Sequence, residues 1–504
     1  MKYTVSENAC IGVVGAGVMG AGIAQVAAQA GHEVLLLDAR EGAAAAAIQS
    51  VAKSLAVLVA KGRMEQAGAD AIVQRIRPAA ALADLAVCAL VVEVIVEKLE
   101  PKQALLRELD ELLAEGALIA SNTSSISITA LANGMKRPQR LVGMHFFNPV
   151  PVMKLVEVVS GAETEPQAAA AVEQLSRRWG KTPVHAASTP GFIVNRIARP
   201  YYAESLALLL ERMGTPELLD RALRSAGFRM GPCELMDLIG HDTNFLVTQS
   251  VFEANFGDKR YMPSLVQRAL VDGGRLGRKV GRGFYEGSPA ASAPVSAPQA
   301  PLAEIVLMGR APLVERLGGW LTQRGVPHLH GESADWRGLR VGHVEVHLSS
   351  GRPAAQLAFE RGHAELAVMD WPIANESTNG LALSFAPKAS EEARAQVFDL
   401  WRTLGWEPLL MQDAPGLVVA RTLAMLVNEG ADAVQQGVCD EAAADTAMKL
   451  GVNYPAGPFE WLAAIGAPAV VQMLDALFDA TRNERYRVSP LLRQKTWRSS
   501  ADPA

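Results

Sequence analysis

Residues 11–24 read IGVVGAGVMGAGIA, and this stretch decides the fold of the N-terminal part. A short apolar run is followed by a GxGxxG turn, with its glycines at Gly15, Gly17 and Gly20. In such a turn the first glycine permits the tight bend and the second lets backbone N–H groups approach a pyrophosphate. The third lets the following helix pack on the strand. That helix begins at Val18, followed by Met19, so the unpaired backbone N–H groups of its first turn face the pyrophosphate. The stretch predicts a dinucleotide-binding strand–turn–helix unit.

A carboxylate lies at the end of the second predicted strand, where dinucleotide-binding units contact the ribose. The next apolar run, residues 33–37, ends at Asp38, which lies 18 residues past Gly20. A carboxylate there can accept hydrogen bonds from the ribose hydroxyls of NAD, and it would repel the extra phosphate of NADP. Arg40 is the complication, because a nearby arginine could accept that phosphate. We expect NAD as the cofactor, and the effect of Arg40 on this choice stays open.

Further apolar runs at residues 90–94, 117–120 and 141–146 alternate with helix-like stretches. This alternation predicts a Rossmann-type α/β domain with a doubly wound parallel sheet. From residue 189 the strand signal fades, and residues up to about 271 are rich in Leu, Ala, Arg and Glu at helical spacing. An all-α domain should therefore follow the sheet domain.

Composition restricts the class of protein. The chain has 504 residues, of which 49% are hydrophobic and 20% charged, with a net charge of −5. This is typical of a globular protein, and the mild acidity argues against a nucleic-acid partner. The four cysteines form neither a CxxC metal pair nor a disulfide framework. We see no signal peptide and no apolar stretch long enough to cross a bilayer. We therefore expect a cytoplasmic protein without a metal site and without a membrane partner.

Residues 288–301 read SPAASAPVSAPQAP, which indicates a semi-extended linker. The sequences on its two sides repeat each other. Pro190-Gly191, Arg196 and Glu204 recur 225 residues later as Pro415-Gly416, Arg421 and Glu429. We expect the same two-domain unit in tandem, the second copy being degenerate. The expected ranges are a Rossmann domain at 1–187, a helical domain at 188–287, a linker at 288–302, a degenerate Rossmann-like domain at 303–412 and a second helical domain at 413–498.

The second copy has lost the residues that carry chemistry. Gly309 keeps the place of Gly15, but Ala311 and Val314 stand where the other two glycines of the turn would be. Their side chains would block a pyrophosphate, so we do not expect a second dinucleotide site. A loose alignment through Pro387 pairs His145 with Leu383 and Asn148 with Ala386, and Ala420 takes the place of Asn195.

Three more stretches of the first copy belong with the turn: SNTSS at 121–125, HFFNPVPVMKLVEVV at 145–159 and TPGFIVNR at 189–196. Together with GRKVGRGFY at 277–285 they resemble the 3-hydroxyacyl-CoA dehydrogenase family over residues 9 to 286. The resemblance implies NAD-dependent oxidation of (S)-3-hydroxyacyl-CoA to 3-oxoacyl-CoA. The region after the linker resembles an eroded second copy. Since the helical domains of one-copy members pair between subunits, we expect an intrachain pseudo-dimer, and a homo-oligomer remains open.

The resemblance also implies roles for individual residues. His145 is the natural base, because an imidazole titrates near neutral pH, and Glu157 would orient it. Ser124 and Asn195 would hydrogen-bond the substrate hydroxyl or the thioester carbonyl, and Asn148 would brace the loop that carries His145. Taken alone, each of these has an ordinary structural interpretation, such as a helix cap for Ser124. Their joint occurrence behind a cofactor turn favours the functional one.

Other positions match the family near its ligands. Glu97, Lys102 and Asn122 would lie near the cofactor, and Ser54 and Lys61 would contact CoA. A basic loop could also meet the CoA phosphates or could simply be a packing tail; its residues are Arg275, Arg278, Lys279 and Arg282.

The long two-copy form resembles the branch of the family that acts in phenylacetate breakdown, which implies 3-hydroxyadipyl-CoA as the substrate. Two alternatives remain open. One is a short-chain 3-hydroxybutyryl-CoA dehydrogenase. The other is a non-catalytic structural protein built on a dehydrogenase fold.

Overall fold

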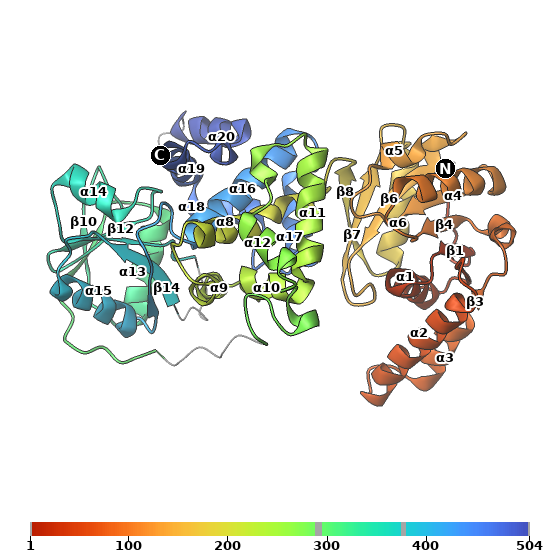
Figure 1. Ribbon diagram of the computed structural model, residues 1–504, viewed down its shortest axis with the longest axis horizontal. Coiled ribbons are helices and arrows are strands. Elements are labelled where there is room, and N and C mark those ends of the chain that lie inside the picture. The colour runs from red at the N-terminus through yellow and green to blue at the C-terminus, as the bar shows by residue number, and fades with distance from the viewer. Residues whose placement is uncertain (1–2, 288–294, 374–379, 502–504) are drawn as a thin grey trace. The chain divides into compact units, whose positions relative to one another are not determined.

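The structure is a computed structural model that describes residues 3–287, 295–373 and 380–501 (Figure 1). It divides into two compact units, which do not follow the simple order of the chain. The first unit combines Met1–Val194 with Gly437–Val452, and the second combines Asn195–Gln436 with Asn453–Ala504. Residues 288–294 of the expected linker lie outside the described residues. Near its end, the backbone N–H groups of Gln299 and Ala300 donate to the carboxylate of Asp399 at 2.9 and 3.1 Å.

The first unit is built on an eight-stranded sheet in the order β3-β2-β1-β4-β5-β6-β7-β8. The strands are β1 (Ile11–Val14), β2 (Val34–Leu37), β3 (Ile76–Pro78), β4 (Leu90–Glu93), β5 (Leu118–Ser121), β6 (Leu141–Phe146), β7 (Leu155–Ser160) and β8 (Thr182–Ala187). The Rossmann-type sheet is thus confirmed. One pair departs from the expected parallel arrangement, because β7 runs antiparallel to β6. The short connection between these two strands explains this, since a parallel neighbour would need a long crossover.

Helices cover this sheet: α1 (Val18–Gln29), α2 (Ala43–Ala60), α3 (Gln66–Gln74), α4 (Leu99–Leu112), α5 (Ile128–Ala132) and α6 (Pro166–Arg178). The small residues of α1 allow a close approach to the rest of the domain. A Cβ added at Gly22 would lie only 2.8 Å from Val150 Cβ. Among the described helices, α2 by itself is long and apolar enough to cross a bilayer by length and composition. It carries Lys53 and packs against α1 and α3.

A helix from late in the chain completes the first unit. Helix α17 (Glu441–Val452) packs against β7 and β8. The backbone N–H of Ala187 donates to the carbonyl of Val438 at 2.8 Å. At Gly451 a Cβ would lie 2.7 Å from Leu155 Cδ2 and 3.0 Å from Val194 Cγ2, so any other residue would require these side chains to shift. The strand that carries Glu157 is therefore supported by a helix from the second half of the sequence.

The second unit begins with a group of helices: α7 (Val194–Ile197, which starts at the last residue of the first unit), α8 (Arg199–Leu210), α9 (Pro216–Ser225), α10 (Pro232–Ile239), α11 (His241–Ala254) and α12 (Leu265–Asp272). A second group follows the second sheet: α16 (Val419–Gln435), α18 (Pro458–Ile465), α19 (Ala467–Thr481) and α20 (Pro490–Ala501). Both groups lie where the sequence predicts helical domains.

A seven-stranded sheet lies between these groups in sequence, in the order β10-β9-β11-β12-β13-β14-β15. Its strands are β9 (Ile305–Met308), β10 (Leu329–Gly331), β11 (Gly338–Val341), β12 (Val344–Leu348), β13 (Leu366–Met369), β14 (Gly380–Phe385) and β15 (Glu407–Leu410), with helices α13 (Pro312–Gln323), α14 (Ala354–Arg361) and α15 (Glu391–Thr403). The strand order matches that of the first sheet without a counterpart of β3. Within the second unit, α9 packs against β14 (Figure 1), just as α17 packs against β7 in the first unit.

This strand order corrects one expected correspondence. Leu383 lies on β14, which takes the place of β7, whereas His145 lies on β6. In the first sheet His145 on β6 faces Glu157 on β7, and the place of β13 between β12 and β14 makes β13 the counterpart of β6. The loose alignment through Pro387 therefore chose the wrong strand. Its consequence is unchanged, because β13 reads LAVM and carries no histidine.

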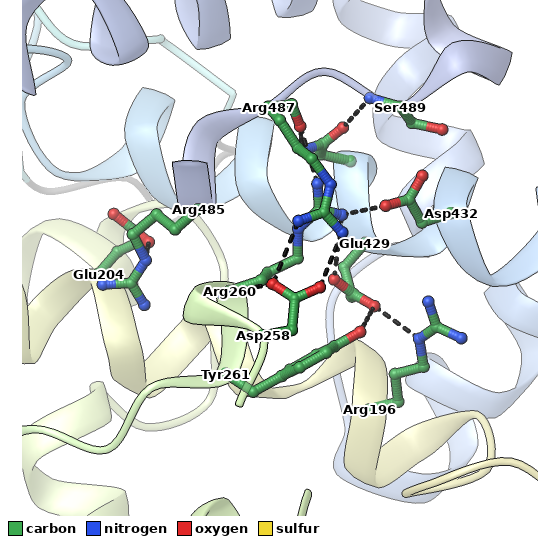
Figure 2. Close-up of polar contacts among 11 residues, drawn as sticks. Arg196, Glu204, Asp258, Arg260, Tyr261, Glu429, Asp432, Arg485, Arg487 and Ser489 are labelled. Atoms are coloured by element: carbon green, nitrogen blue, oxygen red, sulfur yellow. Dashed lines mark hydrogen bonds and ion pairs between the residues drawn. The ribbon is translucent and has the colours of Figure 1, made fainter. Parts of the chain in front are cut away.

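Reciprocal ion pairs join the two helical groups inside the second unit, and Figure 2 shows the pair of Arg196 with Glu429. Arg196 Nε lies 2.6 Å from Glu429 Oε1, and Arg421 Nε lies 2.8 Å from Glu204 Oε2. All four side chains are buried. These are the arginines and glutamates that recur at an offset of 225 residues, so each arginine pairs with the glutamate of the other repeat.

More side chains extend the pattern around Glu429. The Tyr261 hydroxyl donates to Glu429 at 2.6 Å, and Arg260 pairs with both Glu429 and Asp432. Burial alone would raise the pKa of Glu429, but the charges of Arg196 and Arg260 outweigh it and hold the pKa below its ordinary value. Tyr486 donates to Glu204 at 3.0 Å in the corresponding way. Glu429 is therefore the charged centre of one half of this core.

We predict that Glu429→Gln destabilises the second unit by about 3–5 kcal/mol, because it leaves Arg196 and Arg260 buried without their counter-charge. Denaturant unfolding at neutral pH checks this. Since folding lowers the pKa of Glu429, its stabilising contribution is present above the ordinary glutamate pKa of about 4.3 and is lost as the pH falls further. The variant should therefore lose less stability than the native chain on acidification.

The matched control is Asp272→Asn, which breaks the exposed pair between Arg268 and Asp272. Such a surface pair contributes about 0–1 kcal/mol. Equal losses of stability in the two variants would contradict the prediction.

Candidate active site

The glycine turn of the first unit leaves room for a ligand at one position. Gly15 has a φ of 112°, and a Cβ there would lie 2.4 Å from the Val94 carbonyl oxygen. A Cβ on Gly20 would lie 1.8 Å from the Gly15 oxygen. At Gly17, by contrast, a Cβ would meet nothing within 4 Å. Gly15 and Gly20 thus shape the turn, whereas Gly17 keeps the space before the N-terminus of α1 open. No side chain caps that terminus.

Asp38 holds both the turn and Arg40. Its Oδ2 accepts a hydrogen bond from the Ala16 N–H at 2.7 Å, and its Oδ1 lies 3.0 Å from Arg40 Nε. The hydrogen bond from the Arg40 side chain, aided by backbone N–H groups, lowers the pKa of Asp38 to about 2. The carboxylate is therefore ionised at neutral pH and holds the guanidinium that could have accepted the NADP phosphate. This arrangement favours NAD.

His145 and Glu157 meet across the antiparallel pair β6–β7. They are direct partners in the strand register, and His145 Nδ1 lies 2.6 Å from Glu157 Oε2. Glu157 is fully buried and His145 is 6% exposed. Because the carboxylate holds Nδ1, the imidazole orientation is fixed and Nε2 is the nitrogen that remains for a substrate proton.

The other carboxylate oxygen of Glu157 is held by the turn before α7. It accepts hydrogen bonds from the backbone N–H groups of Ile193 and Val194 at 3.0 and 2.9 Å. The turn also places the buried ring of Phe192, with a φ of 46°, edge-on to His145 at 5.9 Å. Sequence reasoning missed these two donors and the Phe192 contact. The only signal was the Gly191-Phe192 pair, because glycine favours the left-handed backbone that the turn adopts.

The SNTSS loop rests on the carboxylate of Glu97. Its Oε1 accepts from Thr123 Oγ1 at 2.6 Å and from the Ser124 N–H at 2.9 Å. Lys102 is buried and lies 2.6 Å from Glu93 and 3.2 Å from Glu97. Burial would raise the pKa of Glu97, but the Lys102 charge and the hydrogen bonds from the loop hold it below its ordinary value. The predicted residues Glu97 and Lys102 thus form a framework beneath Ser124, and their contact with a cofactor stays a prediction.

Asn122 joins the same loop to the end of β6. Its Oδ1 accepts from the Phe146 N–H at 2.8 Å, next to His145. Asn148 is exposed on the loop after β6, where a cis peptide bond precedes Pro149. Asn195 belongs to the second unit, so its part in the site stays a prediction.

The expected CoA contacts differ in their surroundings. Ser54 is exposed on α2, and Lys61 is exposed just past its end. In the basic loop, Arg278 pairs with Glu234 at 2.7 Å and Lys279 pairs with Asp242 at 2.5 Å. These pairs lie inside the second unit and favour the packing interpretation of that loop. Within the described residues, no group of three or more His, Cys, Asp or Glu side chains could hold a metal ion.

Comparison with known families decides the assignment. The 3-hydroxyacyl-CoA dehydrogenase NAD-binding domain matches residues 10–189, and the C-terminal domain of the same family matches both 191–287 and 416–499. A 3-hydroxybutyryl-CoA dehydrogenase reduced Rossmann-fold domain matches residues 346–415. The chain is 41% identical to the 3-hydroxyadipyl-CoA dehydrogenase of Escherichia coli (strain K12), over 96% of this chain and 97% of that one. The chain belongs to the 3-hydroxyacyl-CoA dehydrogenase family.

Other relatives agree with this assignment. The chain is 40% identical to the human mitochondrial hydroxyacyl-coenzyme A dehydrogenase, over 54% of this chain and 90% of that one. Its structure resembles a crystal structure titled 3-hydroxybutyryl-CoA dehydrogenase from Escherichia coli K12, with a TM-score of 0.90 and 39% identity. That match covers 99% of this chain and 100% of the other.

This 3-hydroxyacyl-CoA dehydrogenase is therefore an NAD-dependent oxidoreductase that acts on acyl-CoA substrates. Its second sheet resembles a reduced Rossmann fold, which agrees with the lost glycines of its turn. The same C-terminal family domain matches both helical groups.

We predict that Gly17→Ala and Gly20→Ala separate the two purposes of the turn. Gly17→Ala should keep the melting temperature within about 1 °C, since its Cβ meets no protein atom, but should weaken NADH binding about tenfold or more by obstructing the pyrophosphate. Gly20→Ala should lower the melting temperature by about 4 °C or more, because its Cβ overlaps the Gly15 carbonyl. Fluorescence titration and thermal unfolding measure both effects. A Gly17→Ala variant with native NADH affinity would refute the assignment of the ligand position.

Proposed function

We propose that this dehydrogenase oxidises (S)-3-hydroxyadipyl-CoA to 3-oxoadipyl-CoA with NAD, in the breakdown of phenylacetate. The observation that supports the chemistry is the buried pair of His145 and Glu157 behind a dinucleotide turn. The substrate rests on the near full-length similarity to a protein named 3-hydroxyadipyl-CoA dehydrogenase. The structure match titled 3-hydroxybutyryl-CoA dehydrogenase keeps a short-chain substrate as the second candidate.

The reaction removes one hydrogen from C3 and one from the hydroxyl group on C3. His145 Nε2 accepts the proton of the hydroxyl, and bound NAD supplies the acceptor for the hydride from C3. As the imidazole becomes positively charged, the adjacent Glu157 carboxylate stabilises it without taking the proton. Ser124 and Asn195 hydrogen-bond the substrate oxygens and hold C3 in place. The products are the 3-oxo thioester, NADH and the protonated histidine.

The cofactor would lie along the turn at Gly15, Gly17 and Gly20, against Val18 and Met19. Asp38 would then accept from the ribose, and Asn122, Glu97 and Lys102 would shape the nicotinamide end. Ser54 on α2 and Lys61 just past the end of α2 would contact CoA, and Asn148 would brace the loop after β6.

The second half, we infer, arose by duplication and serves as an intrachain partner in place of a second subunit. Three observations support this. The C-terminal family domain matches twice, the ion pairs of Arg196 and Arg421 are reciprocal, and α9 and α17 each pack on the sheet of the other copy. We further propose that the enzyme works in the cytoplasm, where its described cysteines stay reduced.

We predict that His145→Gln reduces kcat by at least about a hundredfold, since it removes the proton acceptor. NADH affinity should stay within about twofold, because glutamine can still donate to Glu157 and the turn is untouched. Steady-state kinetics with a 3-hydroxyacyl-CoA and NADH titration measure the two effects. The matched control is His185→Gln, an exposed histidine on β8, which should keep full activity. Near-native turnover of His145→Gln would require another base.

Substrate choice is tested in the reverse direction, by NADH oxidation with 3-oxoadipyl-CoA and with acetoacetyl-CoA. We expect kcat/KM to be about tenfold or more higher for 3-oxoadipyl-CoA. The reverse preference would favour the short-chain candidate. No turnover of either substrate would favour a non-catalytic structural protein.

A further inference from the structure

The second sheet has lost its dinucleotide turn, yet a cavity of about 490 Å³ remains at the carboxyl edge of that sheet. Its walls come from the turn after β9, the segment between β10 and β11, the end of β12 and the start of α19. Ligand pockets commonly measure about 300–1,000 Å³, and open α/β sheets place ligands at this edge. The cavity is therefore large enough for a small ligand and lies where such folds hold one.

Two helices begin at this cavity. Ala311, Pro312 and Leu313 at the start of α13 line it, as do Gly466 and Pro468 at the start of α19. These helices have 12 and 15 residues, and within the described part of the chain neither N-cap residue, Ala311 or Gly466, makes a side-chain capping bond. Uncapped helix N-termini present N–H groups and partial positive charge, so both favour an anion in the cavity.

The charged side chains of the cavity walls also favour an anion. Among the described residues, Arg310, Arg337 and Arg352 line the cavity, and Asp335 is the one carboxylate beside them. Arg352 is partly engaged, with Nη1 2.8 Å from Glu360 Oε2. His347 also lines the cavity, but burial lowers its pKa to about 4, so it is neutral at neutral pH. The positive charge therefore comes from arginines, which are suited to phosphoryl oxygens.

A buried hydroxyl in the wall lacks a partner. Ser349 lines the cavity, is 3% exposed, and its Oγ has no hydrogen-bond partner among the described residues. A buried polar atom is costly without a hydrogen bond. Rotation about the Cα–Cβ bond can direct this hydroxyl to a ligand oxygen. This observation is independent of the helix termini and the arginines.

The walls around this hydroxyl are built from packed aromatic side chains. Trp371 donates from Nε1 to the Ser349 carbonyl at 2.9 Å. The Trp336 ring stacks on His347 with centroids 4.2 Å apart and an interplanar angle of 10°. Two buried tryptophans thus shape a preformed cavity, which binds at a lower entropic cost than a flexible surface.

The cavity differs from a dinucleotide site in one respect. A Cβ at Gly309 would lie 2.8 Å from both Arg337 Cδ and the Trp336 carbonyl oxygen, so the segment before β11 closes over the turn. Ala311 and Val314 add side chains where the first copy has Gly17 and Gly20. The turn itself therefore has no room for a full dinucleotide. The adjacent cavity still has room for a smaller ligand.

We propose that this cavity is a second ligand site, which binds the phosphoryl group of a small phosphorylated molecule. Arg310, Arg337 and Arg352 neutralise the anion, the starts of α13 and α19 donate N–H groups, and Ser349 supplies a hydroxyl. The site is separate from the glycine turn of the first unit and does not depend on the substrate proposed above.

The test is calorimetric titration of the full-length enzyme, saturated with NADH, with inorganic pyrophosphate. NADH occupies the glycine turn of the first unit, so binding there does not contribute. We expect one pyrophosphate per chain, with Arg310→Glu and Ala334→Glu each weakening binding about tenfold or more. Both residues are exposed and line the cavity, so neither change should disturb folding, which unchanged melting temperatures would verify.

The matched control is Arg340→Glu, an exposed arginine on β11 outside the cavity. It should leave the affinity within about twofold. Three results would overturn the proposal: no binding of pyrophosphate, equal affinity in native and Arg310→Glu enzymes, or tighter binding of adipate than of pyrophosphate. The last would indicate a carboxylate ligand instead of a phosphorylated one.

Discussion

The buried carboxylate of Glu157 is the constraint on which the first unit depends. A charge removed from water is costly unless all of its hydrogen-bonding capacity is used. One oxygen of Glu157 holds the His145 imidazole, and the other accepts from Ile193 and Val194. Three separate parts of the chain must therefore come together before this charge can be buried. These parts are the strand β6, the strand β7 and the turn before α7.

This requirement also explains why the second half of the chain matters to the first. Strand β7 is covered by α17, whose Gly451 allows contact with Leu155 and Val194. In the second unit the corresponding exchange places α9 on β14. The reciprocal pairs of Arg196 with Glu429 and Arg421 with Glu204 join the helical groups from which these helices extend. Support for the site thus comes from a segment that contains no reacting group.

The second half of the chain contains a turn that resembles the one that holds Glu157. Its turn keeps the same backbone, with φ values of 77° at Gly416 and 52° at Leu417, close to the 78° and 46° of Gly191 and Phe192. A buried carboxylate, Asp370, again accepts from backbone N–H groups of this turn. The residue that faces Asp370 on β14 is Ala382, whose carbonyl accepts from the Asp370 N–H at 2.9 Å, and not a histidine. The second unit thus shows the same packing of a buried carboxylate on this turn, without the histidine that pairs with the carboxylate of the first.

The sequence by itself determined the glycine turn and the apolar strands, and it showed the recurrence of residues at an offset of 225. The turn and the strands are local features, because φ preferences, close approach and apolar runs depend on neighbouring residues. Tertiary structure decided that β7 runs antiparallel and sets Glu157 opposite His145. It also decided that β13, and not the strand of Leu383, takes the place of β6 in the second sheet, and that α17 supports β7. Strand pairing and helix docking join residues far apart in the chain, and burial of apolar surface and charge selects among them.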